Sequence, residues 1–199
     1  MKNKYLNTKR IAIIAIMSAI AAILMVIDFP VSFLAPSFYK MDISDLPCLI
    51  GSFSLGPLAG VLIELLKILI KLMIKPTSTA FVGELSNFLC GISLCIPAAL
   101  IYKKEHDKKG AIKGLAFGGI IMVVISSILN YAFIIPSYVK LYGMPLEAII
   151  KAGNQIFPIV KDKLSFVLIC VSPFNLLKGV IVGILTFFLY KRISKLINK

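Results

Sequence analysis

Apolar stretches of bilayer-spanning length recur along the whole chain, with charged clusters between them. A helix needs about 20 mostly apolar residues to cross the hydrocarbon core of a bilayer. Hydrophobic residues make up 59% of the 199 residues, whereas soluble domains are about 45–50% apolar. This pattern predicts an all-α integral membrane protein that forms a single domain over residues 1–199.

The basic residues indicate how many times the chain crosses the bilayer. The net charge is +13, which in a soluble protein would suggest nucleic-acid binding. In a membrane protein, basic residues gather in cytoplasmic loops instead, so no nucleic-acid partner is expected. Three clusters should therefore share one side: Lys2, Lys4, Lys9 and Arg10; Lys103, Lys104, Lys108, Lys109 and Lys113; Lys191, Arg192, Lys195 and Lys199.

The apolar stretch 45–74 must contain two spans for these clusters to share a side. Gly56-Pro57 within it is a strong turn signal, and division there leaves a short first span that needs tilt or shielding by neighbours. We therefore predict a compact bundle of six transmembrane helices with both termini cytoplasmic. The expected spans are about 10–29, 44–55, 57–74, 80–102, 112–137 and 164–190.

The expected outer loops are 30–43, 75–79 and 138–163. The third is long and contains MPLEAIIKA, which predicts a short interfacial helix. The first is mostly apolar and aromatic, so it either lines a flat organic ligand or packs on its own bundle.

Polar and ionisable residues gather at one depth in the outer half of three spans. Glu84 and Asn87 lie near the outer end of the fourth span, Asn130 in the fifth, and Asn175 and Lys178 in the sixth. Lys178 is about 12 Å below the outer surface, from the rise per helical residue and the thickness of the bilayer core. Such residues are costly in a membrane and indicate a functional site. The alternative is that they only lock the helices together, for example through a Glu84–Lys178 ion pair.

Ser172-Pro173, just before this part of the sixth span, is typical of a helix start, with proline at the first helical position. We therefore expect a helix N-terminus that points into the site. In the third span, Glu64 and Lys67 are three residues apart and are expected to form a local pair, and Lys71 is expected to extend toward the outer surface. Both alternatives, local pairing and contact with a ligand, remain open for these three residues.

The first span carries a stripe of small residues at helical spacing: Ala12, Ala15, Ala19 and Ala22. Small residues let helices approach closely within a membrane. The stripe serves either packing inside the bundle or docking of another membrane subunit.

Sequence motifs for covalent chemistry are missing. The chain has no G-x-x-x-x-G-K-[ST] phosphate loop, and no H-E-x-x-H or G-x-S-x-G pattern. Its four cysteines form no C-x-x-C pair and are expected in the core. We predict no metal, no cofactor and no catalytic residue, so any ATP hydrolysis would belong to another chain. A membrane enzyme that uses Glu84 is a weaker alternative.

The order and spacing of these elements resemble the substrate-binding S components of energy-coupling factor (ECF) vitamin transporters. The alanine stripe, ISDLP, the Gly-Pro turn, GELSNF and PFNLLKG carry the resemblance over essentially the whole chain. PFNLLKG and DLP most resemble the riboflavin-specific members.

The resemblance implies a multi-pass protein of the bacterial plasma membrane that binds riboflavin from outside with high affinity and releases it inside. It also implies docking, through the first-span alanines, with an ECF module of one membrane coupling protein and two ATPase subunits. The ligand residues carried over from the family's motifs are Leu34, Ala35, Asn130, Asn175 and Lys178, with Glu84 and Asn87 in its polar fourth-span motif. An S component for another vitamin or small organic ligand, and a membrane assembly protein that transports nothing, are the alternatives.

Overall fold

The computed structural model describes residues 7–197, without the side chains of residue 142 and residues 194–197. Its elements form a helical bundle with one small antiparallel β ribbon. In chain order they are α1 (Thr8–Val26), β1 (Phe29–Pro30), β2 (Lys40–Met41), α2 (Asp45–Leu55), α3 (Pro57–Ile74), α4 (Val82–Glu105), α5 (Lys108–Leu129), the π-helical turn η1 (Asn130–Ile134), α6 (Ile135–Tyr142), α7 (Leu146–Asn154), α8 (Lys163–Phe166), the π-helical turn η2 (Val167–Val171) and α9 (Ser172–Ile197).

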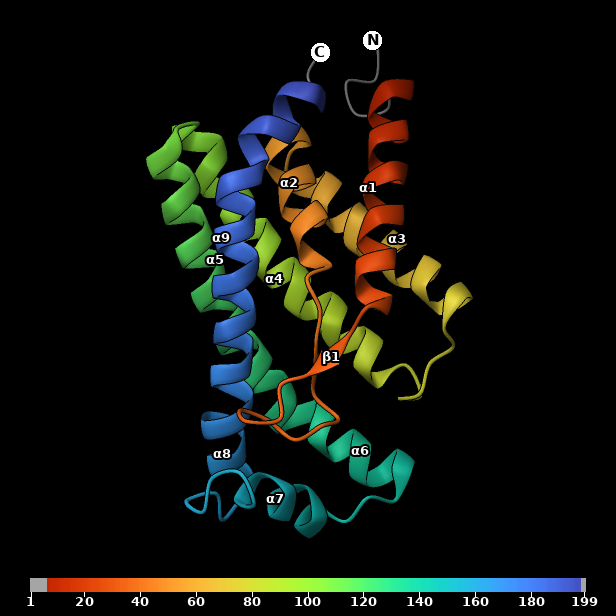
Figure 1. Ribbon diagram of the computed structural model, residues 1–199, viewed down its shortest axis with the longest axis vertical. Coiled ribbons are helices and arrows are strands. Elements are labelled where there is room, and N and C mark those ends of the chain that lie inside the picture. Colours follow the sequence, from red (N-terminus) through yellow and green to blue (C-terminus); the bar gives the residue numbers. More distant parts are fainter. Residues whose placement is uncertain (1–6, 198–199) are drawn as a thin grey trace.

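The bundle has two distinct ends (Figure 1). The start of α1, the α4–α5 turn and the end of α9 lie at one end, which we call the inner end because the described basic residues of these segments gather there. The β ribbon, α6, α7 and α8 lie at the opposite, outer end. This arrangement places residues 27–44 and 142–163 over the outer end of the helices.

Four helical stretches in the described part of the chain are long and apolar enough to cross a membrane: Thr8–Val26, Val82–Glu105, Lys108–Leu141 and Lys163–Ile193. The other two bundle helices are α2, with 11 residues, and α3, with 18 residues and three charges. The α3 charges Glu64 and Lys67 are fully buried inside the protein, so they do not face lipid. That α2 and α3 are two separate spans remains a prediction.

The turn between α2 and α3 lies at Gly56, where the backbone φ of +99° favours glycine. Pro57 begins α3, a position at which its missing N–H costs no hydrogen bond. The short helix α2 is packed against α1, α3, α4 and α9, so its neighbours shield it from lipid.

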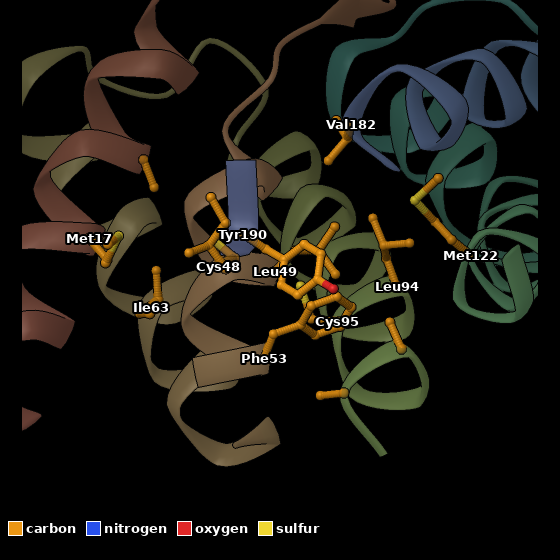
Figure 2. Close-up of a cluster of buried hydrophobic side chains, with 14 of the residues drawn as sticks. Met17, Cys48, Leu49, Phe53, Ile63, Leu94, Cys95, Met122, Val182 and Tyr190 are labelled. Carbon is orange, nitrogen blue, oxygen red and sulfur yellow. The ribbon is translucent and has the colours of Figure 1, made fainter. Parts of the chain in front are cut away.

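Two hydrophobic clusters hold the bundle. The inner cluster surrounds α2 and includes Leu49, Phe53, Leu94 and Tyr190 (Figure 2). Phe53 stacks on Tyr102 with ring centroids 4.5 Å apart. The outer cluster joins the first loop to α6, α7 and α9, and its fully buried members are Ala35, Val160, Phe166, Cys170 and Val171.

The expected helix start at Ser172-Pro173 is wrong. Ser172 has helical angles, and its N–H donates to Val167 O five residues earlier, so α8, η2 and α9 form one continuous helix. Pro173 has no N–H to donate, and the wider π turn just before it lets the helix continue. The same arrangement recurs where η1 precedes Pro136, so neither proline marks a free helix N-terminus.

The expected interfacial helix in the third loop is present as α7. Its buried residues are Ile149 and Gly153. An added Cβ on Gly153 would lie 2.5 Å from Phe166, so this short helix packs tightly on the outer end of the last helix.

Candidate ligand site at the outer end

A cavity of about 450 Å³ opens at the outer end of the bundle. Its walls come from the first loop, the end of α3, the start of α4, η1, α6 and α9. All five polar residues that the sequence placed at one depth line it: Glu84, Asn87, Asn130, Asn175 and Lys178. The structure therefore brings together residues from three expected spans around one space.

Lys178 is the buried cation of this cavity. Its Nζ lies 3.0 Å from Asp45 Oδ2 and 3.6 Å from Asp42 Oδ2, and the lysine is 6% exposed. The two aspartates hold the ammonium from the side of α2 and the first loop. Such pairing is what allows a lysine to remain charged at this depth.

Asp45 also joins Lys178 to a second pair deeper in the bundle. Asp45 Oδ1 accepts a hydrogen bond from Lys67 Nζ at 2.8 Å, and Lys67 lies 2.6 Å from Glu64 Oε2. Glu64, Lys67 and Asp45 are all fully buried. The expected Glu64–Lys67 pair is thus present, as part of a network that reaches the cavity.

Glu84 does not pair with Lys178, so the alternative of a Glu84–Lys178 lock is wrong. Its partners are Lys71, at 2.7 Å, and the hydroxyls of Thr77 and Thr79, each at 2.9 Å. The end of α3 leads into α4 through a short loop, so Lys71 meets Glu84 first.

Asn130 and Asn175 have the same local geometry. Each amide Nδ2 donates to a carbonyl of its own helix four residues earlier, Ser126 O at 2.8 Å and Val171 O at 3.0 Å. This bond fixes the amide plane. Asn130 Oδ1 accepts a hydrogen bond of 2.6 Å from the Tyr39 hydroxyl.

Tyr39 centres an aromatic wall of the cavity. Its ring lies 5.1 Å from Phe38 and 5.8 Å from Phe174, centroid to centroid. Burial, aided by the nearby Tyr138, raises the pKa of the Tyr39 phenol above its ordinary value. The phenol therefore stays protonated and donates to Asn130.

Asn87 faces the first loop as well. Its Nδ2 donates to Asp42 Oδ2 at 3.3 Å. Asp42 thus accepts a hydrogen bond from Asn87 of α4 and forms an ion pair with Lys178 of α9. These contacts hold the first loop against both helices.

The mouth of the cavity carries a separate, more exposed group of charges. Lys40 and Lys75 flank Asp28 at 3.6 Å and 3.3 Å. Their side chains are nearly half exposed, so this group is open to water, whereas Lys178 and Asp42 are buried at the cavity wall.

Sequence reasoning did not single out several lining residues, among them Tyr39, Lys40 and Asp42. It also missed Asp45, which stands behind Lys178. Asp42 and Asp45 lie three residues apart directly before an apolar helix, and a buried lysine without a carboxylate partner was the signal that could have drawn attention to them.

Leu34 and Ala35, predicted to contact the ligand, do not line the cavity. Ala35 is fully buried in the outer cluster and Leu34 packs against that cluster. Their contact with a ligand stays a prediction. This part of the loop packs on its own bundle, whereas Tyr39, Lys40 and Asp42 of the same loop line the cavity.

The four alanines of the stripe on α1 differ in exposure. Ala12, Ala15 and Ala19 are exposed on α1, whereas Ala22 is fully buried. Ala22 therefore serves internal packing, and the exposed stripe is shorter than predicted.

Comparison with known proteins decides the family. The model of the family "ECF transporter, substrate-specific component" matches residues 9–190. The chain belongs to this family. It is accordingly an all-α, multi-pass protein of a bacterial cell membrane, and a component of a transporter.

The relatives agree with one another in their ligand. The riboflavin transporter RibU of Staphylococcus aureus is 35% identical over 193 residues, which cover 97% of this chain and 94% of that protein. The riboflavin transporter FmnP of Bacillus subtilis is 30% identical, covering 90% and 88%. A solved structure of the S component of a bacterial ECF transporter superposes with a TM-score of 0.72 at 32% identity, covering 96% of this chain and 98% of that one.

Proposed function

We propose that this S component binds riboflavin in the outer cavity and delivers it across the membrane when coupled to an ECF module. The observation that carries the proposal is the joint position of Asn130, Asn175 and Lys178 beside an aromatic wall, in a chain whose relatives are riboflavin transporters. A volume of about 450 Å³ falls within the usual range of about 300–1,000 Å³ for small-molecule sites.

The chemistry of the cavity suits a flavin. The flat ring of riboflavin has a large apolar area, which Tyr39 and Phe174 can cover. Its carbonyl oxygens accept hydrogen bonds, which a lysine ammonium donates, and amide oxygens accept from the ring N–H. The ribityl hydroxyls would extend toward the mouth, where Thr79, Glu84 and Lys40 offer donors and acceptors.

Asp45 and Asp42 set the position of Lys178 in this proposal. With two carboxylates beside it, the Lys178 ammonium is already compensated before any ligand enters. The ligand therefore does not need a negative charge to neutralise Lys178. The site accordingly suits an uncharged flavin ring at its deep end.

The test is a riboflavin titration of the purified protein, followed by quenching of flavin fluorescence. Wild-type protein should bind about one equivalent. Lys178→Ala should weaken binding by about tenfold or more, because a hydrogen bond to a charged group contributes about 1.5–3 kcal/mol. Asn175→Ala should weaken it by about twofold to tenfold, because a neutral hydrogen bond contributes about 0.5–1.5 kcal/mol. Lys161→Ala, an exposed lysine outside the cavity, is the matched control.

Folding of each variant is checked by gel filtration and thermal unfolding. Asn175 is the more discriminating position, since its amide Nδ2 bonds within its own helix and, among the described residues, to no other helix. If Asn175→Ala folds normally and binds riboflavin with wild-type affinity, the site assignment fails. If the wild-type protein itself does not quench flavin fluorescence, the ligand assignment fails.

We further propose that the exposed stripe Ala12, Ala15 and Ala19 docks an ECF module of one membrane coupling protein and two ATPase subunits. Small residues exposed toward lipid permit close approach of another helix. Ala15→Trp should therefore abolish riboflavin uptake by cells that contain the module and leave flavin binding unchanged. Ile16→Trp, on an exposed neighbouring residue, is the control, and normal uptake by Ala15→Trp would defeat the docking proposal.

A further inference from the structure

Ser127 of α5 and Ser172 of α9 join the two helical segments that lead to the asparagines of the outer cavity. Their Oγ atoms lie 2.8 Å apart. Neither serine is among the described residues that line the cavity. Any part that these hydroxyls play in ligand binding is therefore indirect.

The two serines stand in the same sequence pattern, S-x-x-N. Asn130 follows Ser127 by three residues, and Asn175 follows Ser172 by three. Residues three apart share a helix face, so each hydroxyl lies on the face that carries its asparagine. Each asparagine amide is in turn fixed by a bond to the carbonyl four residues earlier.

The two helices run in opposite directions, α5 toward the outer end and α9 away from it (Figure 1). Asn130 therefore lies nearly one helical turn outward of Ser127, and Asn175 nearly one turn inward of Ser172. The two amides lie on opposite sides of the serine pair along the helix axes. Their separation depends on the register of α5 against α9, and a slide of one helix along the other would change it.

The packing inward of the serine pair is close and apolar. A Cβ added to Gly179 of α9 would lie 3.0 Å from Met122 Cε and 3.8 Å from Gly119 Cα. Apolar attraction is not directional, whereas a hydrogen bond requires a particular distance and angle. The serine pair is thus suited to set the register of the two helices.

The serine pair also lies where both helices change their winding. The π turn η1 starts at Asn130, three residues after Ser127, and η2 ends at Val171, directly before Ser172. The two π turns contact each other. Helices bend where a π turn interrupts their regular hydrogen bonds. A link at the inner edge of both π turns therefore holds the helices where they are least regular.

The protons of the two hydroxyls show that the link is a hydrogen bond. Ser127 Oγ lies 2.7 Å from Val123 O, and Ser172 Oγ lies 3.0 Å from Val167 O. Two hydroxyl oxygens at 2.8 Å repel each other unless a proton lies between them. Each hydroxyl has one proton, so one serine donates across to the other, which donates to its own helix. A hydroxyl that accepts and donates at once is polarised, which strengthens both bonds.

We propose that Ser127 and Ser172 are positioning residues of the ligand site, whose hydrogen bond holds Asn130 and Asn175 at the separation that fits the flavin ring. The inference rests on binding of riboflavin in the outer cavity, as proposed above. The serines act through the two amides and contact no ligand themselves.

The experiment is a riboflavin titration, followed by fluorescence quenching, of Ser127→Ala, Ser172→Ala and the double variant. Each single variant should lower flavin affinity by about threefold to tenfold, in line with the energy of a hydrogen bond between helices in a membrane. The double variant should bind no more weakly than either single variant, because all three lack the same bond. Ser127→Thr keeps a hydroxyl and should retain wild-type affinity.

The deciding measurement repeats Ser127→Ala in an Asn175→Ala background. With one amide removed, the separation of the two amides no longer matters, so the serine change should leave flavin affinity unchanged in this background. Equal weakening in both backgrounds would show that the hydroxyl supports the bundle as a whole, and would overturn the proposal.

Ser93→Ala is the matched control. Ser93 is a buried serine outside the described cavity lining, and its hydroxyl donates to Cys90 O of its own helix at 2.7 Å. This variant should bind flavin as wild-type protein does. Thermal unfolding of every variant fixes the temperature range in which affinities are compared.

Three further results separate the possible failures. A lower unfolding temperature with unchanged affinity in Ser127→Ala and Ser172→Ala would give the serine pair a purely structural role. Affinity as low in Ser127→Thr as in Ser127→Ala would show that the hydroxyl is not the group that acts. Wild-type protein that binds no riboflavin would instead defeat the proposed function itself.

Discussion

The outer half of the bundle holds its charges in pairs around the proposed ligand cavity, whereas the interior of the inner half is packed with small and aromatic residues. In the outer half, Asp42 and Lys178 lie at the cavity wall and Asp45 lies behind Lys178, and all three are at most 6% exposed. In the inner half, Gly114 and Gly118 let α5 approach the backbone of α4, and Phe53 packs between Tyr102 and Tyr190.

The difference teaches where stability and function lie. A site for a polar ligand in the outer half requires polar and charged walls. Each buried charge in those walls needs a partner of opposite charge, whereas the apolar interior of the inner half needs none. The outer half is therefore expected to be sensitive to single charge changes and the inner half to changes of volume. Three changes sharpen or break this contrast.

The largest effect is expected from Lys67→Met in the buried network. It leaves Glu64 and one interaction of Asp45 without their cation, and loss of one partner of a buried pair costs about 3–5 kcal/mol. Thermal unfolding in detergent should show a large loss of stability. The double variant Glu64→Gln/Lys67→Met should recover much of it, because two buried charges have then been removed together.

Lys113→Met is the control for this prediction. Lys113 pairs with Glu105 on the surface, with 61% of its side chain exposed, and exposed pairs contribute only about 0–1 kcal/mol. A double variant no more stable than Lys67→Met would show that the network is not held by mutual compensation.

A smaller effect is expected in the inner half from Gly118→Ala. A Cβ at this position would lie 2.5 Å from Leu94 O, so α4 and α5 must separate. Overpacking of this kind costs about 1–3 kcal/mol. The neighbouring Gly119→Ala meets no atom within 4 Å and should be neutral or gain up to about 1 kcal/mol from helix propensity.

Flavin affinity should be equal in these two glycine variants at temperatures where both are folded. The comparison uses thermal unfolding for stability and fluorescence titration for binding. A large loss of affinity in Gly118→Ala would show that the inner half also shapes the ligand site.

The smallest effect is expected from Tyr39→Phe, which removes the hydroxyl that donates to Asn130. One neutral hydrogen bond contributes about 0.5–1.5 kcal/mol, so flavin affinity should fall by about threefold to tenfold. Tyr131→Phe, on a tyrosine that does not line the cavity and is 44% exposed, should bind flavin normally. Equal flavin affinities in the two variants would show that the Tyr39 hydroxyl does not position Asn130 for the ligand.

The sequence by itself determined the class of the protein and five members of its polar site. Apolar length gave the membrane helices, and depth along those helices brought Glu84, Asn87, Asn130, Asn175 and Lys178 to one level, where the cavity lies. These inferences rest on distances along a helix, which the chain fixes locally.

Only the tertiary structure decided which groups pair. Lys178 meets Asp45 and Asp42 rather than Glu84, and Glu84 meets Lys71, because pairing depends on how each helix is rotated and which helix lies beside it. The π turns before Pro136 and Pro173 depend on the same packing, as does the burial of Ala22 beside three exposed alanines. Residue depth is a property of one helix, whereas a contact is a property of two, and no single segment of sequence specifies the second.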